Sequence, residues 1–287
     1  MAGTGKYSKI RIADPAVGRG KRISLAGQIP GSVLELKRFA NSFRKTGFWL
    51  NPAFGLKNST GGMPETFGQA ATSPFASCAW RAHGTVIDDT LNNFPPKKLP
   101  SGEYMMTRRD HRQQVSVIVG GREEYNRWQI HPLASYNGKG RPEEPYWYVL
   151  PDGNSLVGLI RDNGRSGRLL RTFSNDNGRT WSKIVKTNFP DATSKFFVLR
   201  TSRGYYAMVS NSNPHRRDPL TLAISPDGLV FTHLFNLVGG RHVDYPHIIE
   251  FDDHLLIAFS GAKQTMEVLK VSLDDLDELI KNEAAKN

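Results

Sequence analysis

The feature that most constrains the fold is a turn that recurs at an almost constant spacing. The turn ends at Gly102, and related turns end at Gly153, Gly204 and His254, so that successive turns are 51, 51 and 50 residues apart. Each turn stands between two runs of β-branched, aromatic and aliphatic residues, the pattern of a β-hairpin. A period of about 50 residues is too long for one hairpin and matches a four-stranded sheet in a repeat protein.

A second marker keeps phase with the first. An Asp-containing turn begins at Ser174, 21 residues after Gly153, and a similar turn begins at Ser225, 21 residues after Gly204. Each unit therefore reads as a hairpin, a strand, an Asp turn and a strand, as in a β-propeller blade. We expect an all-β fold, a β-propeller of four-stranded blades with at least four recognisable blades, or five or six. The four units cover about 96–132, 143–186, 194–236 and 245–273.

Charge and composition suggest three parts: a basic segment at 1–57, the propeller at 58–275 and a C-terminal tail at 276–287. The basic segment holds eleven Lys and Arg residues against two acidic ones. This segment is either irregular or part of a first blade. It contains no strand in phase with the repeated turns, so we expect it to be dispensable for turnover of a small substrate. Residues 28–92 contain strand-like pieces at 32–36 and 47–50, which suggest a fifth, irregular blade or a shortened propeller. Helical signal is confined to the tail, where Ser272 and Asp275 form a candidate capping box.

Composition also narrows the function classes. No apolar run approaches 18 residues, so no membrane-spanning segment is expected. A single cysteine, Cys78, excludes an internal disulfide framework and a zinc site built from several cysteines; neither a metal site nor a cofactor is expected. The basic segment could neutralise phosphates or an acidic polysaccharide, but no nucleic-acid-binding motif accompanies it, so nucleic acid is not the expected partner. The first residues lack an apolar stretch typical of a signal peptide, and a secreted or periplasmic origin would need a longer N-terminus.

The first Asp turn carries a recognisable motif. Ser174, Asp176, Gly178, Thr180 and Trp181 match the S-x-D-x-G-x-T-W pattern of an Asp-box. The carboxylate and the hydroxyl can accept N–H bonds that a tight turn leaves free, glycine permits a positive φ, and the tryptophan packs between blades. We therefore expect a structural role for the aspartate. On this motif the chain, over roughly 94–275, resembles the sialidase superfamily in its BNR-repeat branch.

That resemblance implies a set of site residues. Tyr245 would be the nucleophile and Glu144 the base that activates it, while Arg161 and Arg217 would be two of three arginines that hold a substrate carboxylate. Sialidases differ from most glycosidases in using a tyrosine nucleophile. The chemistry is consistent, because guanidinium groups bind a carboxylate bidentately and a phenol needs a nearby base to become a nucleophile.

Other positions of the family pattern differ. The stretch Phe94–Lys97 stands where sialidases have a Phe-Arg-Ile-Pro signature and contains no arginine. Asp110 lies in the region of the family's acid/base aspartate at a different spacing, and His111 beside it is a second candidate acid/base. Ion pairs of Arg109 and Arg161 with the aspartates that follow them are a structural alternative to ligand binding. Further candidate substrate-binding residues are Arg109, His242, Asp244, His247 and Lys263.

The expected activity is therefore that of an exo-acting glycoside hydrolase on a glycan that carries a carboxylate. Three alternatives stay open. The first is a polysaccharide lyase or rhamnosidase-type enzyme on the same propeller, with His111 or His247 as acid/base. The second is a non-catalytic carbohydrate-binding propeller, and the third, least favoured, is a nucleic-acid binder that uses the basic segment. The expected partner is an acidic oligosaccharide.

Overall fold

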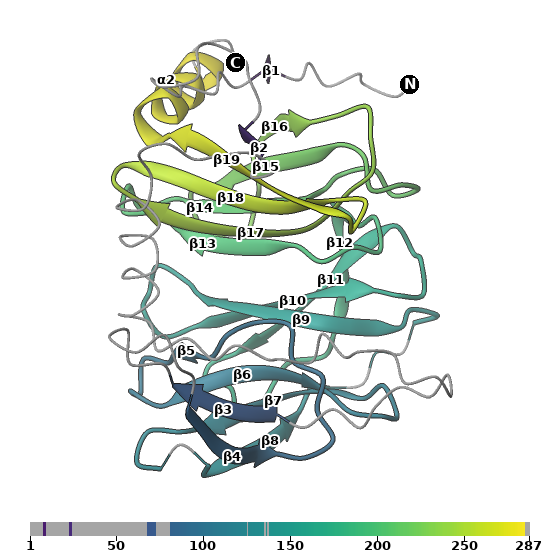
Figure 1. Cartoon of the computed structure of the whole chain (residues 1–287), viewed down its shortest axis with the longest axis vertical. Helices are drawn as coiled ribbons and strands as arrows, with labels where there is room; N and C mark the ends of the chain where they lie inside the picture. The colour runs from purple at the N-terminus through teal and green to yellow at the C-terminus, as the bar shows by residue number, and fades with distance from the viewer. Residues whose placement is uncertain are drawn as a thin grey trace. The chain divides into compact units, whose positions relative to one another are not determined.

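The computed structural model describes residues 8–9, 23–24, 68–72 and 81–284, except 125, 135 and 137. This part of the chain is built almost entirely of antiparallel sheets, followed by α2 (Leu273–Ala284) (Figure 1). The all-β class predicted from the turn spacing is therefore confirmed. Among the described residues, no helix is long and apolar enough to cross a membrane.

The first two predicted units each form a four-stranded sheet whose strands follow one another along the chain. The first contains β5 (Lys97–Lys98), β6 (Tyr104–Arg109), β7 (Val115–Gly120) and β8 (Trp128–Pro132). The second contains β9 (Pro142–Val149), β10 (Leu156–Asp162), β11 (Arg168–Ser174) and β12 (Val185–Pro190).

The last two units follow the same plan and gain strands from the N-terminal segment. The third sheet contains β13 (Phe197–Arg200), β14 (Tyr206–Asn211), β15 (Leu220–Ser225) and β16 (His233–Val238), with β1 (Ser8–Lys9) parallel to β16. The fourth contains β17 (Val243–Phe251), β18 (His254–Gly261) and β19 (Thr265–Ser272), and β2 (Ile23–Ser24) pairs antiparallel with β19.

The basic segment thus takes part in the sheets. The expectation that no blade strand lies in 1–57 does not hold, since β2 is the fourth strand of the last sheet. Two residues are too few to show a strand pattern in the sequence, which is why the pairing was not expected. In the region where a fifth, irregular blade was predicted, β3 (Gly68–Thr72) and β4 (Arg81–Ile87) form a two-stranded sheet; the pieces at 32–36 and 47–50 lie outside the described residues.

The recurring hairpin turns are equivalent, and each lies in a different sheet. The amides of Gly102, Gly153 and Gly204 each donate to the carbonyl three residues earlier, at 2.9, 3.0 and 3.0 Å. Their φ angles of +88°, +73° and +95° favour glycine. The fourth turn is tighter: Asp252 and Asp253 both have positive φ, as in a two-residue type I′ hairpin, and His254 opens β18 instead of lying in the turn.

The Asp-box has the structural role predicted for it. Asp176 Oδ1 accepts hydrogen bonds from Ser174 Oγ, Arg179 N and Thr180 N at 2.8, 3.1 and 2.9 Å, and Oδ2 accepts one from Thr180 Oγ1 at 2.6 Å. The Arg179 guanidinium reaches Glu103 in the hairpin of the first sheet, at 2.8 and 3.0 Å. The motif therefore closes its own turn and also joins two consecutive sheets.

The packing divides the chain into two compact units. Unit 1 takes its described residues from Met1–Phe39, Arg165–Leu169 and Asn188–Asn287, and unit 2 from Ala40–Gly164 and Leu170–Thr187. In unit 2, Met105, Trp147, Leu156 and Ile160 belong to one buried apolar cluster.

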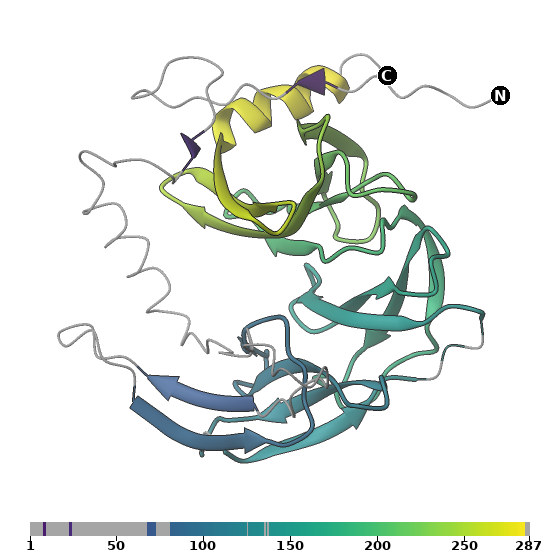
Figure 2. The same ribbon diagram turned by 45° about the vertical axis from the view of Figure 1, so that its right-hand side comes forward.

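In unit 1, α2 lies against β19 (Figure 2), and its side chains Leu273 and Leu276 are fully buried. The amide of Asp275 donates to Ser272 Oγ at 3.2 Å. This is the serine half of the capping box that the sequence predicted at the start of the tail helix.

Candidate functional site

The first strand of the second sheet begins with an irregularity. Along β9 and β10, Glu143 faces Arg161 and Tyr146 faces Leu159, so two residues of β9, Glu144 and Pro145, lie opposite one residue of β10. This is the count of a β-bulge, which redirects a side chain and is common beside active sites. Proline, which cannot donate to the ladder, is well tolerated at such a position.

The first strand of the fourth sheet begins in the same way. Asp244 faces Ser260 and His247 faces Ala258, so Tyr245 and Pro246 lie opposite one residue of β18. The two strands thus share a local sequence pattern, in which a buried acid precedes the bulged residue and a proline follows it.

The bulged residues share an unusual backbone conformation. The φ angles of Glu144 and Tyr245 are +49° and +52°. Residues other than glycine rarely adopt a positive φ angle. This backbone conformation costs on the order of 1 kcal/mol or more, and it is concentrated at functional sites. Glu144 and Tyr245, the base and nucleophile implied by the family resemblance, thus occupy equivalent positions in two sheets.

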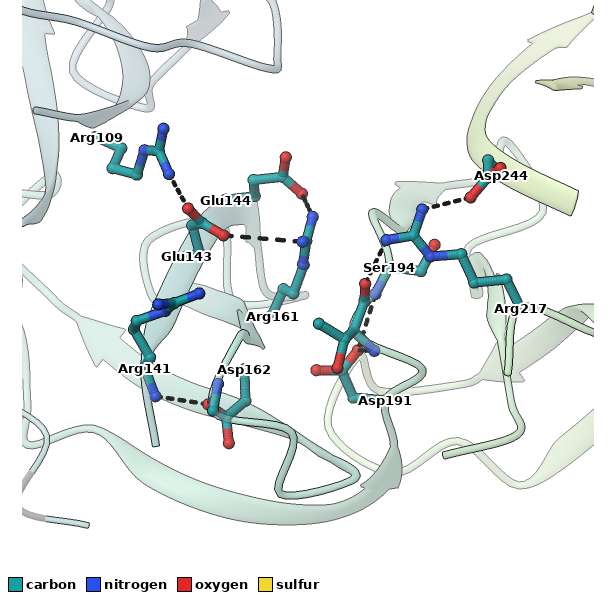
Figure 3. A network of polar contacts seen from close by, with 12 residues as sticks. Arg109, Arg141, Glu143, Glu144, Arg161, Asp162, Asp191, Ser194, Arg217 and Asp244 are labelled. Carbon is teal, nitrogen blue, oxygen red and sulfur yellow. Dashed lines mark hydrogen bonds and ion pairs between the residues drawn. The ribbon is translucent and has the colours of Figure 1, made fainter. Parts of the chain in front are cut away.

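In unit 2 the bulge is surrounded by arginines (Figure 3). Glu143 forms an ion pair with Arg109, and Arg161 Nη1 donates to Glu144 Oε2 at 2.5 Å, with its Nη2 3.8 Å from Glu143. The side chains of Glu143 and Arg161 are only 7% and 11% exposed, so these charges are held away from solvent.

The ion pairs considered for Arg109 and Arg161 with the aspartates that follow them do not form. Arg109 and Arg161 bind the glutamates of β9 and not the aspartates that follow them in sequence. Asp162 instead accepts the backbone N–H groups of Arg141 and Gly164 at 2.6 and 2.8 Å.

In unit 1 the second bulge is also held by an arginine (Figure 3). Arg217 forms an ion pair with Asp244, whose side chain is fully buried, and its Nη2 donates to the carbonyl oxygen of Thr193 at 2.6 Å. His242 Nε2 lies 2.7 Å from the second oxygen of Asp244. Burial lowers the pKa of the Arg217 guanidinium, but hydrogen bonding and charge from Asp244, with smaller contributions from Tyr245, outweigh it and raise the pKa. Arg217 therefore remains a cation.

Two cations face the ring of Tyr245. The guanidinium carbon of Arg217 and the ammonium of Lys263 lie 5.5 and 5.2 Å from the ring centroid, within the range of a cation–π interaction. Lys263 is placed by the β18–β19 hairpin turn, whose Ala262 amide donates to the carbonyl of His242 at 3.2 Å. Negative charge that develops on the phenol oxygen would be favoured in these surroundings.

The remaining predicted residues lie elsewhere. The His247 ring packs against Phe197, with 3.9 Å between the ring centroids. The carboxylate of Asp110 closes its own turn by accepting the amide of Gln114 at 2.7 Å. His111 contacts Asp89, a residue that the sequence analysis did not identify.

The structure thus brings together two sets of the predicted residues. One, in unit 2, contains Glu144, Arg161 and Arg109, joined through Glu143; the other, in unit 1, contains Tyr245, Arg217, Asp244, His242 and Lys263. The pairing of Glu144 with Tyr245 stays a prediction. Within the described ranges, no group of three or more His, Cys, Asp or Glu residues could hold a metal ion.

Comparisons with known proteins identify the fold. The model of the BNR repeat-like domain matches residues 93–257, whereas no curated protein matches the sequence. The chain is structurally similar to the intramolecular trans-sialidase of Ruminococcus gnavus in complex with oseltamivir carboxylate, with 15% identity, a TM-score of 0.61, and 75% of this chain and 52% of that chain covered.

Two further solved structures share the fold. The leech intramolecular trans-sialidase has 14% identity and a TM-score of 0.62, with 75% of this chain and 37% of that one covered. The α-L-arabinofuranosidase Arb93A of Fusarium graminearum has 14% identity and a TM-score of 0.52, with 73% and 68% covered. The chain spans about half the length of the bacterial trans-sialidase and just over a third of the leech protein. The four antiparallel sheets are the blades of a sialidase-like β-propeller.

Proposed function

Because the chain belongs to the BNR repeat-like family, we propose that it acts on carbohydrates, as an exo-acting glycoside hydrolase on a glycan that carries a carboxylate. One observation carries this proposal: the same strained bulge presents a carboxylate, Glu144, in one blade and a phenol, Tyr245, in another, each beside an arginine whose side chain is mostly shielded from solvent. A base and a nucleophile of these types are what a tyrosine-based glycosidase requires.

In the proposed reaction, Tyr245 attacks the anomeric carbon of the terminal sugar while Glu144 accepts the phenol proton. The Tyr245 Oη–carbon bond forms as the glycosidic bond breaks, and water then cleaves the glycosyl–enzyme bond. Arg217 and Lys263 lower the cost of negative charge on the phenol oxygen. Arg161 binds the carboxylate of Glu144 and so fixes its position. This mechanism requires the carboxylate of Glu144 to come within hydrogen-bond reach of the Tyr245 hydroxyl.

The arginines are the reason to propose an acidic glycan. Arg109, Arg161 and Arg217 are fixed by protein carboxylates, and guanidinium groups held in this way suit the binding of a ligand carboxylate. The Ruminococcus gnavus relative was solved with oseltamivir carboxylate, a ligand that carries this group.

A neutral sugar is the second candidate substrate. The same three ion pairs already neutralise the arginine charges, which would weaken binding of a further carboxylate. The similarity to an α-L-arabinofuranosidase agrees with a propeller that accepts a neutral sugar.

A panel of aryl glycosides tests the proposal and separates these candidates. The panel contains an α-sialoside, a uronide, an α-L-rhamnoside and an α-L-arabinofuranoside, assayed with the wild type, Tyr245→Phe and Glu144→Gln. On the accepted sugar we expect kcat to fall by about 10³-fold or more for Tyr245→Phe and by about 10²–10⁴-fold for Glu144→Gln. Thermal unfolding should change little, because each substitution removes few atoms.

Matched variants control for the type of substitution. Tyr104→Phe, at the start of β6, and Glu278→Gln, on the exposed face of α2, should retain full turnover. Full turnover by Tyr245→Phe would exclude the tyrosine mechanism, and a uronide product with a new double bond would identify a lyase. Measurable glycan binding without turnover of any substrate would indicate a non-catalytic carbohydrate-binding propeller.

A further inference from the structure

A second group of titratable side chains lies at the β6–β7 hairpin of unit 2. One carboxylate, that of Asp89, holds both the backbone and the ring of His111: Oδ1 accepts the His111 N–H at 2.8 Å and Oδ2 lies 2.8 Å from Nδ1. The imidazole is 69% exposed and the carboxylate 39%. The ring is therefore held on its Nδ1 side, and most of its surface is exposed to solvent.

The charges around this pair determine which nitrogen can react. The hydrogen bond from the His111 side chain is the largest effect on the pKa of Asp89 and lowers it; burial opposes this, and the backbone N–H of His111 and the charge of Arg108, whose Nη2 is 3.5 Å away, lower it further. Asp89 is thus an anion wherever an imidazole titrates. An anionic acceptor at Nδ1 holds the proton there in the neutral ring and leaves the Nε2 lone pair as the basic site.

Other charged groups also face the pair. Arg112 Nε lies 3.4 Å from His111 Nε2, at the outer limit of a hydrogen bond. Arg108 is 3.9 Å from Asp110, whose carboxylate is already bound to the turn amide of Gln114. Arg112 therefore adds positive charge on the side from which a ligand would approach Nε2.

The dyad is tied to the end of β6 that also holds the glutamates of β9. Leu91, two residues after Asp89, exchanges backbone hydrogen bonds of 2.8 and 3.0 Å with Arg109, the last residue of β6. Arg109 in turn binds Glu143, the neighbour of Glu144. A single residue, Arg109, thus connects the segment that carries the dyad to the bulge that carries the proposed base.

We propose that His111, oriented by Asp89, is the proton-transfer residue of this site, an inference that rests on the proposed glycosidase function. In the first step the protonated Nε2 gives its proton to the glycosidic oxygen as the carbon–oxygen bond breaks, while Tyr245 binds the anomeric carbon and Glu144 takes the phenol proton. In the second step the neutral imidazole takes a proton from the attacking water, and Glu144 returns its proton to the departing tyrosine oxygen. Asp89 is a positioning residue in this scheme.

Substrates that differ only in their leaving group test this role. A poor leaving group such as an alkoxide needs a proton in the transition state, whereas a dinitrophenolate does not. For His111→Gln we expect an about 10²–10⁴-fold loss of kcat on an alkyl glycoside. The pre-steady-state burst of dinitrophenolate should keep its wild-type rate, followed by slow turnover, because the second step still lacks its base.

Asp89→Asn should also lower kcat on the alkyl glycoside, by less than His111→Gln does, and should displace the pH–rate profile. The control variant Asp88→Asn changes the exposed neighbouring residue and should behave as the wild type. The nitrogen-15 shifts of His111 give a readout that is independent of activity: in the wild type the neutral ring should carry its proton on Nδ1. A proton on Nε2, or a His111→Gln variant as fast as the wild type on alkyl glycosides, would overturn the proposal. Neither result would affect the tyrosine mechanism, which is tested separately by Tyr245→Phe. Full activity of that variant would exclude the tyrosine mechanism, and the dyad proposal would fail with it.

Discussion

Replacing Asp176 by asparagine isolates the charge of the Asp-box aspartate while it keeps the size of the side chain. In the folded protein this carboxylate accepts four hydrogen bonds within its turn. Burial raises its pKa, but hydrogen bonds from Thr180, Ser174 and Arg179 outweigh this and lower the pKa from 3.8 to about 2. Because solvent screens much of this exposed turn, a shift of this size corresponds to about 1–2 kcal/mol of stability at neutral pH.

The sign of the pH dependence follows from that shift. The folded pKa lies below the unfolded one, so the stabilisation is complete above pH 3.8 and is lost as the pH falls towards 2. At pH 7 we expect Asp176→Asn to melt about 2–8 °C below the wild type. The two melting temperatures should converge between pH 4 and pH 2.

Differential scanning calorimetry across this pH range measures both effects, with Asp88→Asn as the matched exposed control. Turnover of the accepted glycoside should be unchanged below the melting temperature, since the side chain serves its turn. An unchanged melting temperature with abolished turnover would refute the structural interpretation of the Asp-box. So would a stability difference that does not shrink as the pH falls from 4 to 2.

Two further predictions concern single contacts. The ammonium of Lys97 lies 4.0 and 4.3 Å from the ring centroids of Tyr146 and Trp147, and burial lowers its pKa to about 7. Lys97→Met should therefore raise the melting temperature most at pH 7 and below, where the folded protein would otherwise hold a buried charge. This gain should shrink as the pH rises towards 10. An unfolding curve for Lys97→Met that parallels the wild type at every pH would contradict this. Deleting residues 1–24 removes β2 from the edge of β19, so we expect a lower melting temperature and more aggregation at 37 °C, measured by calorimetry and light scattering; a truncated protein as stable as the full chain would show that β2 contributes nothing.

The blades were predictable from the sequence because their signals are local. Glycine in a positive-φ turn and the Asp-box residues specify their turns through contacts within a few residues. Because these turns recur at a constant spacing, the number and order of the strands between residues 97 and 272 could be predicted. The short β2 strand lacked such a signal, since two residues carry no alternating pattern.

The site was only partly predictable, because its contacts depend on register and on distant partners. Glu144 and Tyr245 were identified by resemblance, but the bulges became visible only once the neighbouring strand was known. Arg109 binds Glu143, 34 residues away, and not the adjacent Asp110. Consecutive strand residues point to opposite faces, so adjacency in sequence was a poor guide. Asp89, 22 residues before His111, had no sequence signal at all.

The claim that Tyr245 is the nucleophile is tested most directly by trapping the intermediate. The fluorinated glycosyl fluoride of whichever sugar the aryl glycoside panel identifies would be incubated with the wild type and with Tyr245→Phe, and the peptides analysed by mass spectrometry. We predict one added glycosyl group on the oxygen of Tyr245 in the wild type and none in the variant. A sugar attached to any other residue, or turnover of the reagent with no covalent adduct, would contradict the mechanism.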